Sequence, residues 1–350
     1  MKFGFFFQLP CAPQQTERER YRDTLVQIEH GDRLGFHTAW LAELHFYPEF
    51  SVMSAPLIVA AAAAQRTQQI RFGMAVSLLP LSDPIRTAEE AATVDLLSDG
   101  RLVFGVGRGT NPLHYGGFNI PMHESRERFN EALEIVTRAW TQPSVTYEGK
   151  YYQVKDVAVY PKPLQQPHPP IRIATNSSDT FPLAGDLGYP MFSSLVVVPL
   201  PRFRQDIAVY WQHFHAAGHQ RTGNEVALLF PLYVAATEAE ASQVPRASIM
   251  HYFQVLAQRM VAGDADLDSA TRERNKEMQA RLQRLTFEEV RENVAIIGTP
   301  EQCIERITWL REEFQLSELI CWFNPGGLMP QETVLTSMSR FASQVMPHFP

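Results

Sequence analysis

Eight short apolar runs, rich in β-branched and aromatic residues, alternate along the chain with longer amphipathic stretches. This alternation is typical of βα units and therefore of a parallel sheet. The predicted strands are Lys2–Phe7, Thr38–Ala42, Arg71–Ser77, Leu102–Val106, Ile171–Ala174, Pro190–Leu195, Glu225–Ala235 and Glu318–Phe323. Eight parallel strands most simply close into a barrel, because closure removes the sheet edges. The sequence thus predicts an α/β fold, a (β/α)₈ TIM barrel with insertions.

Two stretches are longer than a βα connection requires. Residues 146–163 alternate apolar and polar side chains around Glu148-Gly149-Lys150, which predicts a hairpin or excursion. Residues 238–293 are rich in charged residues and helix formers, and 272–285 has few apolar positions, which predicts an exposed or mobile helical insertion. No repeat or linker marks a boundary, so we expect one domain over residues 1–350.

Charge and cysteine content exclude several classes of protein. A formal net charge of −7 argues against nucleic-acid and anionic-membrane partners, which require a basic surface. The three cysteines, Cys11, Cys303 and Cys321, are an odd number without metal or redox spacing, so no disulfide framework is expected. Reduced thiols fit the cytosol. The apolar N-terminal run meets Pro10 too early for a signal peptide, and no apolar stretch is long enough to span a bilayer. We expect a cytoplasmic protein without membrane or nucleic-acid partners.

Candidate site residues lie at the C-terminal ends of four of the predicted strands. In a TIM barrel the loops after the strands meet at one mouth, where functional residues gather. The candidates there are Glu43, Leu44, His45, Ala75, Val76, Gly107, Arg108, Gly109, Thr110, Asn176, Ser177, Ser178 and Thr180.

The loop after the fifth strand, Thr175–Thr180, suits a phosphate. Hydroxyl and amide side chains at a helix N-terminus offer several donors and the positive end of the helix dipole. The alternative is plain N-capping, which uses the same residue types. Arg108, flanked by glycines, could reach the same phosphate or could instead pair with a carboxylate, and Arg126 is a weaker candidate. Together the three features favour a phosphate.

The run Gly105–Gly109 resembles a dinucleotide fingerprint but lacks its context. That motif opens a helix directly, whereas Thr110-Asn111-Pro112 predicts a loop here.

His45 is the histidine that falls at a predicted strand end with an acid, Glu43, two residues earlier. Such a histidine can donate or accept a proton near neutral pH, although it could also be hydrogen-bonded in the barrel wall. His215 and His219 have helical metal-ligand spacing, but no third ligand accompanies them, so we expect no metal.

Long strings of this chain, in the same order, are similar to the bacterial luciferase family of flavin-dependent monooxygenases. The strings are MKFGFFFQLP, GFHTAWLAELHFYPEFS, RFGMAVSLLPLSDPIR, DLLSDGRLVFGVGRGTNPLHYGGFN, the Ser125-Arg126 pair, IIGTPEQCIERI and SQVMPHF. The similarity runs nearly end to end and is weakest over 238–293, where the family carries a mobile loop over its active site.

The resemblance implies roles for the candidate residues. It makes Ala75–Val76 a non-proline cis peptide beneath the flavin ring, with Gly109 and Thr110 offering backbone groups to the flavin. Glu43 and His45 then line the reacting side. The implied ligands of the phosphate of flavin mononucleotide (FMN) are Arg108, Arg126, Ser177 and Thr180, with Asn176 and Ser178 beside them.

Two positions depart from the family pattern. Leu44 stands where the luciferase alpha chain has the first, catalytic histidine of a pair, and Gly107 replaces a cysteine near the reactive carbon of the flavin. We therefore expect no light emission, and extra room for substrate beside Gly107. Leu44, Gly107 and Leu195 form the predicted substrate pocket.

The resemblance implies a two-component monooxygenase. A separate reductase would supply reduced FMN (FMNH₂), O₂ would form a flavin C4a-peroxide, and His45 would act as acid or base while oxygen enters a small or carrier-tethered organic substrate. One alternative is an oxidoreductase that transfers hydride with the deazaflavin F420. Another is a non-catalytic flavin-binding protein, against which a full set of eight strands argues. By analogy with the family, we expect a homodimer.

Overall fold

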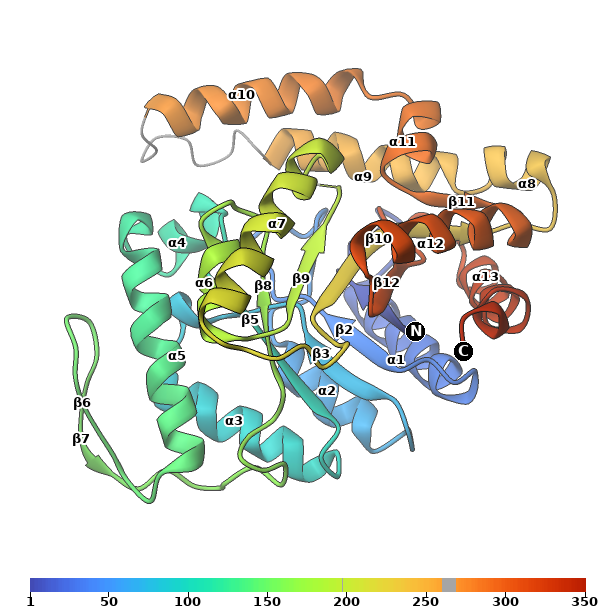
Figure 1. The fold of residues 1–350 in the computed structure, drawn as a ribbon. Coiled ribbons are helices and arrows are strands. Elements are labelled where there is room, and N and C mark those ends of the chain that lie inside the picture. The colour runs from blue at the N-terminus through green and yellow to red at the C-terminus, as the bar shows by residue number, and fades with distance from the viewer. Residues whose placement is uncertain (197, 260–268) are drawn as a thin grey trace.

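A closed barrel of eight parallel strands forms the centre of the computed structural model (Figure 1), which describes residues 1–196, 198–259 and 269–350, with the backbone alone at 269–271, 274 and 275. The barrel order is β1-β2-β3-β5-β8-β9-β10-β12, and β12 pairs with β1 to close it. The strands are β1 (Lys2–Phe7), β2 (Thr38–Leu41), β3 (Arg71–Met74), β5 (Leu102–Gly107), β8 (Ile171–Ala174), β9 (Met191–Ser194), β10 (Val226–Val234) and β12 (Glu318–Trp322). The predicted TIM barrel and its eight strands are confirmed.

Two short strands lie outside the prediction. The third predicted strand, Arg71–Ser77, is interrupted: β3 ends at Met74, and after two residues the chain continues as β4 (Ser77–Leu78), which pairs with β5 alone. β11 (Ile296–Gly298) extends the sheet outside the barrel by pairing with the last residues of β10.

Helices pack around the barrel and bury their apolar faces against it. Two of them begin with capping boxes, Thr16 with Glu19 and Thr299 with Gln302, which satisfy free N–H groups of the first turn. The surrounding helices are α1 (Glu17–Arg33), α2 (Pro56–Ala64), α3 (Pro84–Leu97), α4 (Pro112–Gly117), α5 (Ser125–Thr141), α6 (Thr180–Leu187), α7 (Leu200–Ala216), α12 (Pro300–Phe314) and α13 (Gln331–Gln344). Short 3₁₀ turns lie at Leu79–Leu81, Met122–Glu124 and Met346–His348.

The inside of the barrel is filled at its N-terminal end. Trp40 is fully buried and donates its indole N–H to Glu318, which also pairs with Arg172 at 3.3 Å. Above this cluster, partly exposed apolar side chains form what we call the apolar floor: Phe6, Ala75, Val76, Ala174 and Leu229. Because the N-terminal end of the barrel is filled by side chains, a ligand can enter only from the C-terminal ends of the strands.

The first predicted excursion is confirmed as a two-stranded antiparallel hairpin, β6 (Val145–Glu148) and β7 (Gln153–Val157). It lies beside α5 at the edge of the molecule (Figure 1). The carboxylate of Glu131 in α5 accepts the backbone N–H groups of Lys150, Tyr151 and Tyr152, which attaches the turn to the helix.

The second predicted insertion is helical, as expected, with α8 (Glu238–Gln243), α9 (Arg246–Arg259), α10 (Ser269–Arg284) and α11 (Phe287–Asn293); its residues 260–268 lie outside the described residues. Helices α9 and α10 run side by side across one end of the barrel (Figure 1). In α9, the hydroxyl of Ser248 donates to Pro325 O at 2.6 Å, and the ring of Tyr252 packs edge-on against Trp322 at 4.6 Å. Since both partners follow or end β12, α9 covers the C-terminal end.

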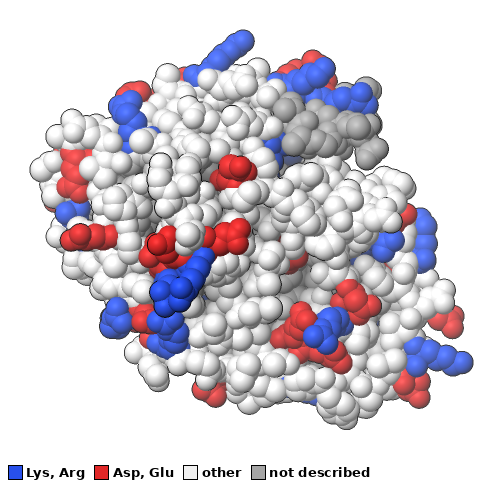
Figure 2. All heavy atoms as spheres, turned by 180° about the vertical axis from the view of Figure 1, so that it is seen from behind, with Lys and Arg blue, Asp and Glu red and all other residues white. Residues whose placement is uncertain are grey.

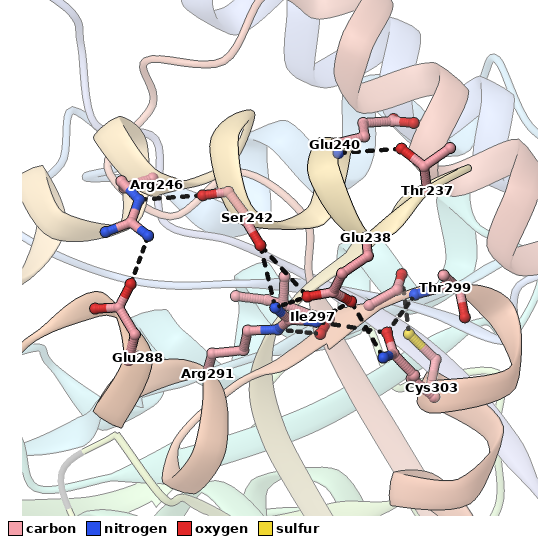
Figure 3. A network of polar contacts seen from close by, with 12 residues as sticks. Thr237, Glu238, Glu240, Ser242, Arg246, Glu288, Arg291, Ile297, Thr299 and Cys303 are labelled. Atoms are coloured by element: carbon pink, nitrogen blue, oxygen red, sulfur yellow. Dashed lines mark hydrogen bonds and ion pairs between the residues drawn. The ribbon is translucent and has the colours of Figure 1, made fainter.

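A polar network joins the ends of this insertion to each other and to β11 (Figure 3). Arg291 of α11 pairs with both carboxylate oxygens of Glu238 in α8 and donates to Ile297 O of β11 at 3.0 Å. Arg246 at the start of α9 pairs with Glu288 of α11. Two ends of the insertion are therefore fixed against the sheet.

Among the helices of the described ranges, none has the length and apolar character needed to cross a membrane. On the face in Figure 2, acidic and basic side chains are interspersed among larger uncharged areas.

Candidate active site at the C-terminal mouth of the barrel

Two arginines converge on one carboxylate after β8. Asp179 Oδ2 lies 2.7 Å from Arg108 Nη2 and 2.5 Å from Arg126 Nη2, and Arg108 also donates to Ser177 Oγ at 3.1 Å. Burial raises the pKa of Asp179, but the hydrogen bond from Ser177 and the two guanidinium groups outweigh it, so its pKa lies below the ordinary value. We call Arg108, Arg126 and Ser177 the anion cluster, because they hold a negative group at this place.

The sequence left open whether Arg108 serves a phosphate or pairs with a carboxylate, and in this structure it pairs with Asp179. Asp179 precedes α6, yet its side chain makes no capping hydrogen bond. The hydroxyl of Thr180 donates to Ser177 O at 2.7 Å. The Asp179 carboxylate therefore contacts the arginines and not the N-terminus of α6.

Asn176 and Ser178, which were predicted to lie beside the phosphate ligands, contact other residues. Asn176 Oδ1 accepts from Ser194 N at 3.1 Å, and Ser178 Oγ donates to Asp206 Oδ1 at 2.9 Å while accepting from Arg202. The structure therefore joins Ser177 to the two arginines, whereas Asn176 and Ser178 tie the loop to β9 and α7.

The loop between β5 and α4 is formed by residues 108–111. Gly109 adopts φ +70°, and a Cβ there would lie 2.9 Å from Leu78, so glycine permits both the turn and the close approach. Asn111 caps α4 through its Oδ1, while its buried Nδ2 has no hydrogen-bond partner. The predicted loop ends earlier than expected, because α4 begins at Pro112.

The peptide bond between Ala75 and Val76 is cis, as the resemblance implied. It lies in the apolar floor, beside the end of β5. A Cβ on Gly107 would lie 2.8 Å from Val76 Cγ2. The expected extra room beside Gly107 is thus filled by the side chain of Val76, and the glycine is needed for close approach of the two segments.

The other two predicted pocket residues differ in position. Leu195 is only 4% exposed and packs in the main hydrophobic core. Leu44 is partly buried and packs against the same core, and its backbone N–H donates to Met53 O.

Glu43 and His45 form a pair at the end of β2. His45 Nε2 lies 3.1 Å from Glu43 Oε1, and Glu43 Oε2 accepts the backbone N–H of Leu78 at 3.0 Å. The carboxylate thus fixes the ring and leaves Nδ1 of His45 as the nitrogen able to hold or accept a proton. This arrangement suits a general acid or base.

A second histidine, which the sequence reasoning missed, lies beside this pair. His114 of α4 is buried, its ring lies 5.5 Å from that of His45, and its Nε2 accepts the backbone N–H of His45 at 3.2 Å. Burial, followed by the charges of Arg259 and His45, lowers the pKa of His114 to about 3, so it stays neutral. No spacing signal could have found it, since 69 residues separate the two histidines.

The metal alternative finds no support in the positions of its histidines. The prediction that His215 and His219 share a helical face is wrong, because α7 ends at Ala216 and His219 instead contacts Asp186 O. Across the described part of the chain, no group of three or more possible metal ligands occurs. All three cysteines are free, as expected.

The fold and the mouth together define a TIM-barrel protein with an anion cluster, an apolar floor and a histidine–carboxylate pair at one end. The model of the luciferase-like monooxygenase family matches residues 1–314, and the chain belongs to that family.

Individual proteins are similar over different shares of the chain. The uncharacterized protein y4wF of Sinorhizobium fredii is 39% identical over 180 residues, so the chain spans about half the length of that relative. The oxygenase component of the flavin-dependent trigonelline monooxygenase of Acinetobacter baylyi is 26% identical over 100% of this chain and 96% of its own.

Solved structures agree with the fold over its full length. The monooxygenase RslO1 from Streptomyces bottropensis matches with a TM-score of 0.83 at 27% identity, covering 100% of both chains. The oxygenating constituent of 3,6-diketocamphane monooxygenase from Pseudomonas putida, in complex with FMN, also matches with a TM-score of 0.83, at 20% identity over 99% of this chain and 98% of the other.

Proposed function

We propose that this protein is the oxygenase of a two-component monooxygenase, which binds reduced FMN at the C-terminal mouth and uses O₂ to insert oxygen into a small organic substrate. The observation that carries the proposal is the anion cluster, placed at the same mouth as the apolar floor and the Glu43–His45 pair. A flavin mononucleotide has an anionic tail and a largely apolar ring, which fit these two parts.

The residues present suit FMN in three respects. Arg108 and Arg126 already hold a carboxylate, so they can hold a phosphate, with Ser177 and Thr180 as further donors. Asn111 Nδ2 is a buried donor without an acceptor, which a polar group of the cofactor would satisfy. Ala75 and Val76 are partly exposed apolar residues of the floor, which suits contact with the ring.

When bound, reduced flavin supplies the reaction with O₂, and the protein supplies binding, orientation and shelter. The apolar floor and the covering helix α9 exclude water from the ring. Glu43 holds His45 so that Nδ1 can hold or move a proton at the reacting side. Glu43 is thereby a positioning residue.

The trigonelline relative is named an oxygenase component, which supports a separate reductase as the partner of this chain. A cytoplasmic location, a homodimer and a reaction without light emission remain part of the proposal. The substrate is small or carrier-tethered, because the mouth lies beneath α9.

The decisive experiment is a titration with photoreduced FMN under anaerobic conditions, followed by calorimetry. We expect saturable binding that weakens roughly ten- to a hundredfold in Arg108→Gln, since a charge-assisted contact is lost. Arg204→Gln is the matched control, because Arg204 pairs with Glu313 on the outside of α7. Tighter binding of F420 than of reduced FMN would favour the hydride-transfer alternative and contradict the proposal.

A second measurement addresses the non-catalytic alternative. With a flavin reductase, NADH and ¹⁸O₂, the oxygenase should transfer one ¹⁸O atom to an accepted substrate. Tight FMN binding without oxygen transfer to any compound of a broad panel would identify a flavin carrier instead.

A further inference from the structure

Arg259, at the end of α9, has no counter-ion among the residues that the structure describes. Arg259 stacks on the ring of Phe50, with its guanidinium carbon 4.0 Å from the ring centroid. Within residues 1–196, 198–259 and 269–350, no carboxylate forms an ion pair with it. Burial lowers the pKa of Arg259 to about 10, so the group stays charged at neutral pH. A half-buried guanidinium without an acceptor is costly, which points to a ligand that completes it.

The surroundings of Arg259 belong to the reacting side of the mouth. Its positive charge acts on His114, whose Nε2 accepts the backbone N–H of His45. Phe50, on which it stacks, follows β2 in the same loop as His45. Arg259 therefore lies near the histidine pair, whereas the anion cluster is built from the ends of β5 and β8.

Aromatic rings lead from Arg259 into the barrel. Phe50 stacks on Tyr252 at 5.8 Å, Tyr252 meets Trp322 at 4.6 Å, and Trp322 meets Phe6 at 5.3 Å between ring centroids. Phe6 is part of the apolar floor. Phe50, Tyr252 and Trp322 are buried, so the packing between Arg259 and the floor is apolar and aromatic.

We propose that Arg259 binds the carboxylate of the substrate, so that the protein acts on an organic acid with an apolar or aromatic body. The statement that the acid is a substrate rests on the proposed function, whereas the binding of a carboxylate at Arg259 does not. One planar guanidinium matches one carboxylate in a bidentate pair. Glu43, the acid that contacts His45, is already held by that ring and by Leu78 N, so it does not compete for Arg259.

A monoanion suits this place better than a phosphate ester. A phosphate dianion needs several donors, and these are gathered in the anion cluster. Arg259 offers one guanidinium group stacked on an aromatic ring. Its N–H donors are too few to satisfy all oxygens of a phosphate dianion.

The test is calorimetric titration of the FMN-saturated protein with benzoate, benzamide and phenyl phosphate. We expect benzoate to bind at least roughly tenfold tighter than benzamide, and Arg259→Gln to weaken benzoate binding about ten- to a hundredfold. Arg259→Lys should retain part of the affinity, because the charge remains. Arg246→Gln, on the same helix but paired with Glu288, should change nothing.

Each opposite result overturns the inference. Equal binding of benzoate and benzamide, no saturable binding of benzoate, or unchanged benzoate binding in Arg259→Gln contradicts a carboxylate site. Tighter binding of phenyl phosphate assigns Arg259 to a phosphate. Loss of FMN affinity in Arg259→Gln would assign Arg259 to the cofactor site. Failure of FMN to bind the unmodified protein would contradict the proposed function instead. Benzoate titration without FMN would then test Arg259 by itself.

Discussion

The carboxylate of Asp179 is an anion that the protein itself places between Arg108 and Arg126. A phosphate arriving at the same arginines has to compete with it. Asp179 should therefore weaken FMN binding, although it lies in the centre of the residues that bind the phosphate.

The substitution Asp179→Asn tests this competition. We expect the dissociation constant for FMN to fall about three- to tenfold, because two partly exposed ion pairs each contribute only a fraction to about 1 kcal/mol. Isothermal calorimetry at low salt measures it. Asp206→Asn serves as the control, since Asp206 contacts Ser178 and Arg202 outside the anion cluster. Unchanged or weaker FMN binding in Asp179→Asn would contradict the competition.

His114 makes stability depend on pH. Its pKa is lowered from 6.5 to about 3 in the folded protein, so the unfolded chain binds more protons between these values. Stability should consequently decrease as pH falls from 6.5 toward 3, by on the order of 3 kcal/mol at pH 4. Urea unfolding at several pH values, compared with His114→Gln, measures this. A variant with the same pH dependence as the parent protein would show that His114 is not the cause.

At the residue level, sequence reasoning found the parts of the mouth but not all of their partners. Arg108, Ser177, Glu43 and His45 were identified because they follow predicted strands. Sequence reasoning did not identify His114, Arg259 or the pairing of Asp179 with the arginines. Each depends on contacts between chain segments that only the folded barrel brings together.

At the scale of elements, the passage from β3 to β4 packs tightly against the end of β5. The contact is made by Val76 and Gly107, where an added Cβ would lie 2.8 Å from Val76 Cγ2. A branched side chain held in the floor cannot easily move away.

We therefore expect Gly107→Ala to lower the free energy of unfolding by about 1–3 kcal/mol through overpacking. Adding Val76→Ala should restore part of this loss, so the double mutant should lose less than the sum of the single variants in urea unfolding. Gly116→Ala is the control, since a Cβ there meets no atom within 4 Å. Strict additivity of Gly107→Ala and Val76→Ala would rule out the contact as the reason for glycine.

The eight barrel strands were predictable because each is a short apolar run bounded by turn residues. β4 and β11 were not, since a strand of two or three residues carries no periodicity. The helical character of 238–293 followed from composition, but the position of α9 depends on Ser248 and Tyr252 meeting the end of β12, which no local pattern encodes.

At the scale of the whole molecule, the mouth is assembled from strands at both ends of the chain and covered by α9. The binding site should therefore be lost only when the whole protein unfolds. FMN at a hundredfold excess over its dissociation constant should thus stabilise the protein by about 2.7 kcal/mol. Differential scanning calorimetry should record an upward shift of Tm, and a clearly smaller shift in Arg108→Gln at the same FMN concentration, because that variant binds FMN more weakly. An equal shift in both proteins would mean that FMN binds elsewhere.

Asp179 has one more consequence for the protein in a cell. Two guanidinium groups and one carboxylate leave a single net positive charge where two would otherwise be exposed. Abundant anions such as inorganic phosphate and sugar phosphates, which lack a flat ring to settle on the floor, then gain too little to displace the aspartate. The mouth stays free for the one phosphate that brings its own hydrophobic anchor.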